Sequence, residues 1–214
     1  MSNIAADESS FSTINAENKY PCYNFSNFNI TKNTLPITVI AIRIEAARNS
    51  SDFHRNSSFS LAYTTCFAKC SEIFGQTQLC LSIEQRSNII LGIFNTPAPT
   101  EINKVFTTIS KAVFPVVNTI NNPQAEIKAA VFMDTGNSDT VHFADNTIFT
   151  SHTLWLGNII ERTIKICNAT ALRADPALLI THNMYDKLDK AYQNKFLKSY
   201  YLFHICCFGD YQFS

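Results

Sequence analysis

The sequence predicts an α+β fold: a ferredoxin-like βαββαβ sandwich with an additional helix and additional strands toward its C-terminal end. In two stretches, 38–44 and 78–83, apolar residues occupy alternate positions, as they do in β-strands. In two others, 58–74 and 106–120, apolar residues recur every three or four positions, as on one face of a helix. Together with the apolar stretches between them, these segments follow the order of a ferredoxin-like domain.

Each expected element is marked by its own local signal. Ile40, Ile42 and Ile44 occupy alternate positions, which predicts a strand with one aliphatic side. Four polar residues, 84–87, separate two apolar stretches, which predicts a β-hairpin. Pro115 is expected to bend the second helix, because proline removes a backbone hydrogen bond. The expected order is strand 38–44, helix 58–74, hairpin strands 78–83 and 89–94, a helix that starts near Thr100 and has its apolar face at 106–120, strand 129–133, one or two strands within 141–156, helix 157–167, strand 177–181, helix 185–196 and a β-like tail, 200–213.

The chain is expected to hold one domain preceded by a polar arm. A length of 214 residues is usual for a single domain. Residues 1–34 are rich in Ser, Asn and Asp and show little periodicity, so they are expected to form a flexible arm, with the domain at 35–214. The first residues show neither the basic nor the apolar part of a secretory signal, and a cytoplasmic location is expected.

The composition excludes several classes of function. The chain has 17 basic and 17 acidic residues, and the basic ones are scattered singly, which argues against nucleic-acid binding. None of the five glycines is placed to form a G-x-G-x-x-G or Walker A loop. No stretch of 18 apolar residues predicts a membrane span. The seven cysteines include no C-x-x-C pair and are interpreted as free thiols.

Four short motifs carry a family resemblance. They are Arg48-Asn49-Ser50-Ser51 after the first strand, the stretch from Gly92 to Pro97 at the end of the hairpin, Met133-Asp134-Thr135-Gly136 at a strand end, and Trp155-Leu156-Gly157 before a helix. In this order they resemble motifs of the class III nucleotidyl cyclases, the adenylate and guanylate cyclases. More narrowly, the chain is similar to the bacterial pyrimidine cyclases of the Pycsar antiviral defence system, over about residues 36–213.

The resemblance implies an activity and an assembly. Cyclases of this family convert a nucleoside triphosphate into a 3′,5′-cyclic monophosphate and pyrophosphate. They act as head-to-tail dimers with sites at the interface, where two aspartates of one protomer hold two Mg²⁺ or Mn²⁺ ions. An asparagine and an arginine of the other protomer position the ribose and stabilise the transition state.

The chain carries other residues at the four positions that the resemblance assigns to this chemistry. Ala46 and Asn88 stand at the positions of the metal-binding aspartates, and Glu161 and Lys165 at those of the asparagine and the arginine. Magnesium prefers anionic oxygen ligands, of which Ala46 offers none and Asn88 one neutral carbonyl. Lys165 keeps the positive charge but lacks the planar fork of arginine. We therefore expect a divergent cyclase whose catalysis is lost or weak.

Three features leave room for a working site. Glu45 lies beside Ala46 and could replace the missing aspartate after a slip or bulge of one residue. A second cyclase chain in a hetero-pair could supply the metals, although that site would still receive Glu161 and Lys165. Asp134 is a further candidate ligand, but its place in a strand-end motif favours a structural role.

The loop 48–51 and Glu84 are the candidate nucleotide contacts. Backbone N–H groups, hydroxyls and one arginine can hold phosphates without metals. By resemblance, Glu84 stands at a position that takes part in base selection. Its carboxylate would accept a hydrogen bond from the exocyclic amine of cytosine or adenine.

Three functions follow from these residues. The first is a subunit that binds a nucleoside triphosphate or a partner chain in phage defence, with little or no cyclase activity. The second is a working cytidylate or uridylate cyclase, and the third is a ferredoxin-like interaction domain without a nucleotide. His142 and His152 are expected to be hydrogen-bonded structural residues, and Trp155 to pack beneath the following helix.

Overall fold

The computed structural model describes residues 28–46, 53–120, 127–145, 150–169, 177–201 and 204–209. The elements in chain order are β1 (Phe28–Ala46), α1 (Phe53–Gly75), β2 (Cys80–Arg86), β3 (Ile89–Asn95), α2 (Pro99–Thr108), a π-helical turn (Ile109–Val113), α3 (Phe114–Ile120), β4 (Ile127–Asp145), β5 (Thr150–Leu156), α4 (Asn158–Ala169), β6 (Ala177–Thr181), α5 (His182–Lys187), α6 (Lys190–Gln193), β7 (Leu197–Tyr201) and β8 (His204–Gly209).

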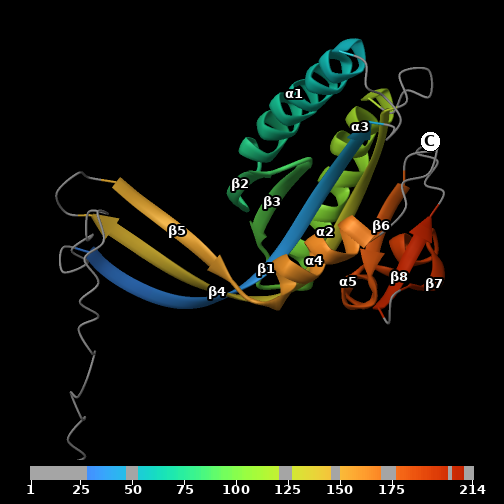
Figure 1. The fold of residues 1–214 in the computed structure, drawn as a ribbon. Helices are drawn as coiled ribbons and strands as arrows, with labels where there is room; N and C mark the ends of the chain where they lie inside the picture. The colour runs from blue at the N-terminus through green and yellow to red at the C-terminus, as the bar shows by residue number, and fades with distance from the viewer. Residues whose placement is uncertain are drawn as a thin grey trace, which may run out of the picture.

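One sheet runs through the middle of the fold in the order β2-β3-β1-β4-β6-β8-β7, and β5 pairs with the second half of β4 (Figure 1). β6 is parallel to β4, and the other pairs are antiparallel. The βαββαβ order followed by a further helix and strands confirms the predicted α+β fold.

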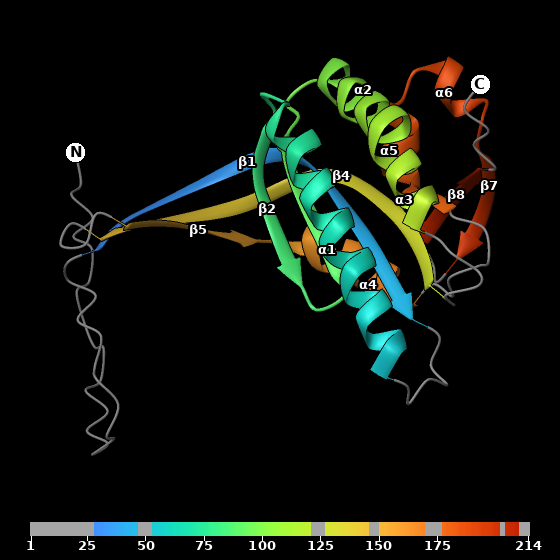
Figure 2. The ribbon, with the colours of Figure 1, turned by 90° about the horizontal axis from the view of Figure 1, so that it is seen from above.

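Helices cover both faces of this sheet (Figure 2). Ile40 and Ile42 of β1 belong to the core cluster beneath α1, α2 and α3. Val39 and Ala41 belong to a second cluster beneath α4. Successive side chains of a strand point to opposite faces, so a strand buried on both faces is apolar at most of its positions. The aliphatic series predicted for this strand therefore faces α1–α3, and the residues between its members face α4.

β1 and β4 extend beyond the body of the molecule and form an arm with β5 (Figure 1). β1 begins at Phe28, which pairs with Asp145, so residues 28–34 lie in a strand and not in the polar arm expected there. In this arm Thr34 Oγ1 donates a hydrogen bond to Asp139 Oδ1 at 2.6 Å, and Lys32 Nζ lies 3.2 Å from Asp139 Oδ2. Residues 32–34 are exposed, so no apolar alternation marks them as a strand.

Two of the expected helices are interrupted. The helix expected to start near Thr100 starts at Pro99, and its π-helical turn ends two residues before Pro115. π-turns and proline both disturb regular helical hydrogen bonding. The irregularity is thus a π-helical turn just before Pro115, and α3 continues through the proline, so the bend expected at Pro115 stays a prediction. The helix expected at 185–196 is split, because Leu188 and Asp189 are extended between α5 and α6. In the described part of the chain, no helix is both long and apolar enough to cross a bilayer.

Candidate functional site

The end of β1 lies beside the turn between β2 and β3. The Ile44 amide donates a hydrogen bond to the Asn88 carbonyl at 3.1 Å, one step beyond the last β1–β3 pair. Ser87, the other residue of this two-residue turn, has φ 55°, a conformation that favours glycine. The fold therefore brings together the two chain segments that the resemblance assigns to the metal-binding aspartates.

Glu45 and Ala46 lie on opposite faces of the sheet. Glu45 continues the series of Val39 and Ala41, which faces α4, whereas Ala46 continues the isoleucine series. The pairing of β1 with β4 is unbroken through both residues. Glu45 therefore points away from the face of Ala46, and β1 does not show the slip or bulge of one residue that would bring Glu45 to the position of Ala46.

The charge of Glu45 is compensated by Arg43, two residues earlier on the same face. Nη2 of Arg43 donates to Glu45 Oε1, and Nη1 donates to the carbonyl of Cys167 in the last turn of α4. The Arg43 side chain is 7 % exposed and that of Glu45 is 30 % exposed. The last carbonyls of a helix have no partner within the helix, so Arg43 also caps α4. The sequence spacing gives the Arg43–Glu45 pair but not the contact with Cys167.

The residues at this end of the sheet do not fit a pair of divalent cations. Ala46 has no ligand atom, Asn88 offers one neutral amide, and Glu45 is bound by a guanidinium. Among the described residues, no group of three or more His, Cys, Asp or Glu side chains is arranged to hold a metal ion. Hard divalent cations are held by several oxygen ligands, of which carboxylates are the strongest.

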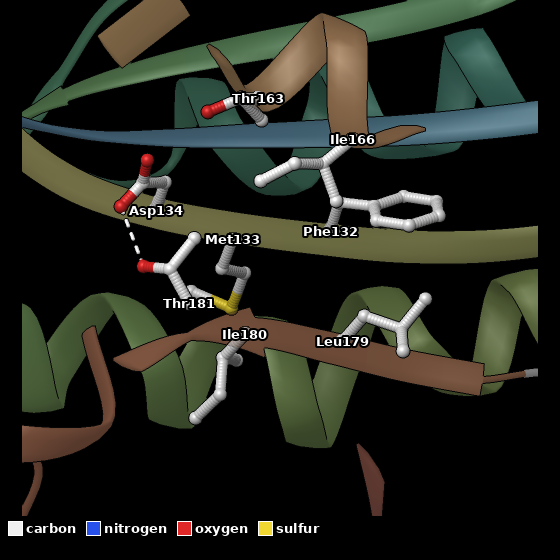
Figure 3. A pocket seen from close by; sticks show the side chains of 8 residues that line it. All are labelled: Phe132, Met133, Asp134, Thr163, Ile166, Leu179, Ile180 and Thr181. Carbon is white, nitrogen blue, oxygen red and sulfur yellow. Dashed lines mark hydrogen bonds between the residues drawn. The ribbon is translucent and has the colours of Figure 1, made fainter. Parts of the chain in front are cut away.

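Asp134 is part of a buried network and not an open ligand (Figure 3). Its carboxylate is fully buried and accepts hydrogen bonds from the Thr135 amide at 2.8 Å, Thr181 Oγ1 at 2.6 Å and Arg162 Nε at 2.6 Å. Burial raises the pKa of Asp134, although Thr181 and Arg162 act in the opposite direction. Because both oxygens have protein partners, the network joins β4, β6 and α4, and the alternative of Asp134 as a metal ligand loses its support.

A small cavity lies beside this network, between α4 and strands β4 and β6 (Figure 3). Its volume is about 10 Å³, which is the space of about one water molecule. Thr163 of α4, Asp134 and Thr181 contribute its polar atoms, and the other lining side chains are apolar. The cavity is too small for a nucleotide.

Glu161 and Lys165 lie on the exposed side of α4. Their side chains are 70 % and 80 % exposed, and their charged atoms are 3.8 Å apart across one helical turn. The opposite side of the helix is buried against the sheet through Ile159 and Ile160. The two residues are therefore accessible to a ligand or a second chain, as positions contributed across a dimer interface require.

Glu84 is also compensated within its own strand. Arg86 Nε and Nη2 donate to Glu84 Oε2 at 3.0 and 2.8 Å. The other predicted nucleotide contacts, Arg48 to Ser51, lie outside the described residues, so their role stays a prediction. The sequence singled out Glu84 for base selection without assigning it this partner.

The remaining candidate residues have structural roles where the structure describes them. His142 Nδ1 is 3.2 Å from Thr153 Oγ1, which confirms the expected hydrogen-bonded histidine, while the His152 side chain lies outside the described part. Trp155 packs against the cluster beneath α4. Gly157, at the start of that helix, has φ +134°, which side chains rarely adopt.

No protein family model matches the sequence, and no curated protein matches it. Solved structures do. The adenylyl cyclase CyaB from P. aeruginosa matches with a TM-score of 0.59 and 10 % identity, over 85 % of this chain and 97 % of that chain. This chain has the nucleotidyl cyclase fold.

Two further structures give the same result. The guanylyl cyclase Cya2 matches with a TM-score of 0.60 and 12 % identity, over 83 % of this chain and 92 % of that one. A bacterial light-regulated adenylyl cyclase matches with a TM-score of 0.60 and 11 % identity, over 83 % of this chain and 52 % of that one. At such identities the likeness concerns the fold, so any activity has to be argued from the residues of this chain.

Proposed function

We propose that this chain is a cytoplasmic, divergent member of the antiviral pyrimidine-cyclase type that binds a nucleoside triphosphate or a partner chain and has little or no cyclase activity. The observation that carries the proposal is the end of β1. The end of β1 lies beside Asn88, and the resemblance assigns the metal-binding aspartates to Ala46 and Asn88, which offer no side-chain ligand and one amide, while the neighbouring Glu45 is bound by Arg43. If each lost metal function lowers the rate about a thousandfold, it raises the barrier by about 4 kcal/mol.

A head-to-tail pair is part of the proposal. Glu161 and Lys165 are exposed on α4, where a second chain can receive them. One matching guanylyl cyclase domain is described as a non-canonical dimer and two others as monomeric, and a rhodopsin-guanylyl cyclase core is described in complex with ATPαS. In this chain the pair would be a homodimer or a hetero-pair with another cyclase chain. The molar mass of the purified protein, measured by light scattering, tells whether the chain pairs with itself.

The activity test uses the purified chain with ATP, GTP, CTP or UTP and Mn²⁺, and mass spectrometry of the products. We expect no cyclic nucleotide above the level of a sample without protein, together with a rise in melting temperature at millimolar nucleoside triphosphate. Robust formation of cyclic CMP or UMP would refute the loss of catalysis. No shift with any of the four nucleotides would favour a ferredoxin-like interaction domain instead.

A working cytidylate or uridylate cyclase is the second candidate, because Glu45 is a carboxylate directly beside the position of Ala46. Glu45 faces α4, away from Ala46, so β1 would have to shift by one residue for Glu45 to act as a ligand there. This candidate requires Arg43 to release Glu45. It predicts an active parent and an inactive Glu45→Ala variant, and the base preferred by the parent would test the role of Glu84.

A further inference from the structure

We infer that β5 is the docking site for a second copy of this chain, and that two β5 strands pair antiparallel about a two-fold axis at Trp155. β5 forms an edge of the arm that β1 and β4 extend beyond the body of the molecule (Figure 1). Among the described residues, β5 pairs with β4 alone, so the backbone N–H and C=O groups of its other edge are available to another strand. This interface is separate from the head-to-tail pair proposed above, which uses α4.

β5 lacks the protection that the other edges of the sheet have. Its sequence, from Thr150 to Leu156, contains no Asp, Glu, Lys, Arg or Pro, and its pairing with β4 shows no bulge. By contrast, β2 has a bulge and charged residues, β7 contains Lys198, and the free edge of β1 in the arm contains Lys32. Charges, proline and bulges usually keep an exposed edge from pairing with another chain. Within the described sheet, β5 is thus the edge that is open to pairing.

Two exposed leucines on one face of β5 are the side chains that a second copy would cover. Leu154 is 49 % exposed and Leu156 is 41 % exposed. They stand two residues apart on the strand and so share one face. Leu154 pairs across the arm with Val141, which is half-buried. In the described structure, two of the four exposed large apolar side chains are therefore neighbours on this one short strand.

The order of the side chains makes β5 complementary to itself. With the two-fold axis at Trp155, Leu154 of each copy lies opposite Leu156 of the other, so each leucine is covered by a leucine. A register shifted by one residue would put the leucines of the two copies on opposite faces of the joined sheet. Because β5 contains no acidic residue, lysine or arginine, the pairing brings none of these charges together.

This pairing closes at two copies. Each copy uses its one unprotected edge, and the edges that remain carry charged residues, so the product is a dimer and not a fibre. A strand of seven residues is about 24 Å long, so the interface is small. Interfaces under about 1,200 Å² are typical of weak and transient complexes. We therefore expect a reversible dimer whose population rises with protein concentration.

The first test is sedimentation velocity of the purified chain over a range of concentrations. We expect wild type to shift from monomer to dimer as the concentration rises. Leu154→Lys with Leu156→Lys places lysines opposite lysines and should weaken self-association at least about tenfold. Leu61→Lys makes the same change at the exposed leucine of α1 and, as the matched control, should leave self-association unchanged. A wild type that stays monomeric, or a double variant that dimerises as wild type does, would overturn the inference.

A second double variant, Leu154→Glu with Leu156→Glu, tests the register. Neither double variant should pair with itself, whereas a mixture of the two places lysines opposite glutamates and should restore the dimer. With a fluorescent label on one variant, the sedimentation of the label measures the mixed dimer. A mixture that stays monomeric would contradict the pairing about Trp155.

Trp155 is the only tryptophan of the chain, so its fluorescence reports on this strand alone. We expect the emission maximum of wild type to change over the concentrations at which the dimer forms, and that of the lysine variant to be independent of concentration. A mass that doubles without a change in this emission would place the association elsewhere, and would overturn the inference while leaving the head-to-tail pair intact. The wild-type measurement decides even if the double variants do not fold.

Discussion

Single acidic residues around the candidate site have basic neighbours of their own element. Glu45 and Glu84 are each matched by an arginine two positions away on a strand, and Glu161 by Lys165 one helical turn later. Both spacings place the two side chains on one face. Exposed ion pairs of this kind contribute at most about 1 kcal/mol to the free energy of unfolding. Of the three basic residues, only Arg43 is largely buried, so only Arg43 holds its acidic partner, Glu45, in a fixed ion pair.

The buried carboxylate of Asp134 is expected to be important for stability. Asp134→Ala would leave the hydrogen-bond donors of Arg162 and Thr181 without their acceptor, and we expect a loss of about 2–4 kcal/mol in the free energy of unfolding. Urea denaturation measures this. Asp139→Ala, in the exposed arm of the same strand, is the control and should have a much smaller effect. Similar losses in both variants would contradict the structural role of the network.

The pH dependence of stability should carry the signature of Asp134. Burial raises its pKa in the folded state above the value of about 3.9 in an unfolded chain. The folded protein then binds this proton more tightly, so the associated stability is present below about pH 3.9 and is lost as pH rises through the folded-state pKa. The free energy of unfolding of wild type minus that of Asp134→Asn should fall over this range. If this difference rose with pH instead, the prediction for Asp134 would be contradicted.

Sequence spacing predicts only part of this residue-scale chemistry. Ala46 and Asn88, which the resemblance places where the family has aspartates, are visible in the sequence, and so is the possible role of Glu45. The roles of Arg43 and Arg162 are not, because their second partners, Cys167 and Asp134, are distant in sequence and meet them only through the packing of α4 on the sheet.

At the scale of elements, close packing of α1 on β3 depends on Gly92. A methyl group there would lie 2.8 Å from a ring carbon of Phe74 and 2.9 Å from one of Phe94. These two rings are in edge-to-face contact, with their centroids 5.1 Å apart. We expect Gly92→Ala to lower the free energy of unfolding by about 1–3 kcal/mol, because the core is already filled. The methyl group of Gly75→Ala meets no atom within 4 Å, so this variant should be neutral or slightly stabilising. Thermal unfolding of both variants measures the two effects. If Gly92→Ala were equally neutral, the packing described for α1 would be wrong.

Elements with a buried face were predictable, and those without one were not. The buried parts of β1 and β3 and the buried faces of α1 and α4 have clear apolar patterns in the sequence. The extension of β1 into the arm that it forms with β4 and β5 was not predicted, because residues 32–34 are exposed and polar. The break between α5 and α6 was missed because the apolar spacing of Tyr185, Leu188 and Tyr192 continues across it, although Leu188 itself is extended.

At the scale of the whole molecule, the chain has the cyclase fold, and we propose that its cyclase site is altered. The matching cyclases are 10–12 % identical to this chain, so the common feature is the arrangement of buried elements. A structural metal would have to bind the folded state and would stabilise it by mass action. We expect the melting temperature to be the same in EDTA and in millimolar Mn²⁺ without nucleotide. A clearly lower melting temperature in EDTA would reveal a bound structural metal and contradict this expectation.

The most direct test is the anomalous diffraction of crystals grown with Mn²⁺ and a non-reactive analogue of CTP or UTP. We expect a map in which Arg43 remains bound to Glu45, and no manganese peak lies beside Ala46 and Asn88. Two manganese peaks at that place, coordinated by this chain and by the triphosphate, would contradict it and would identify a working cyclase.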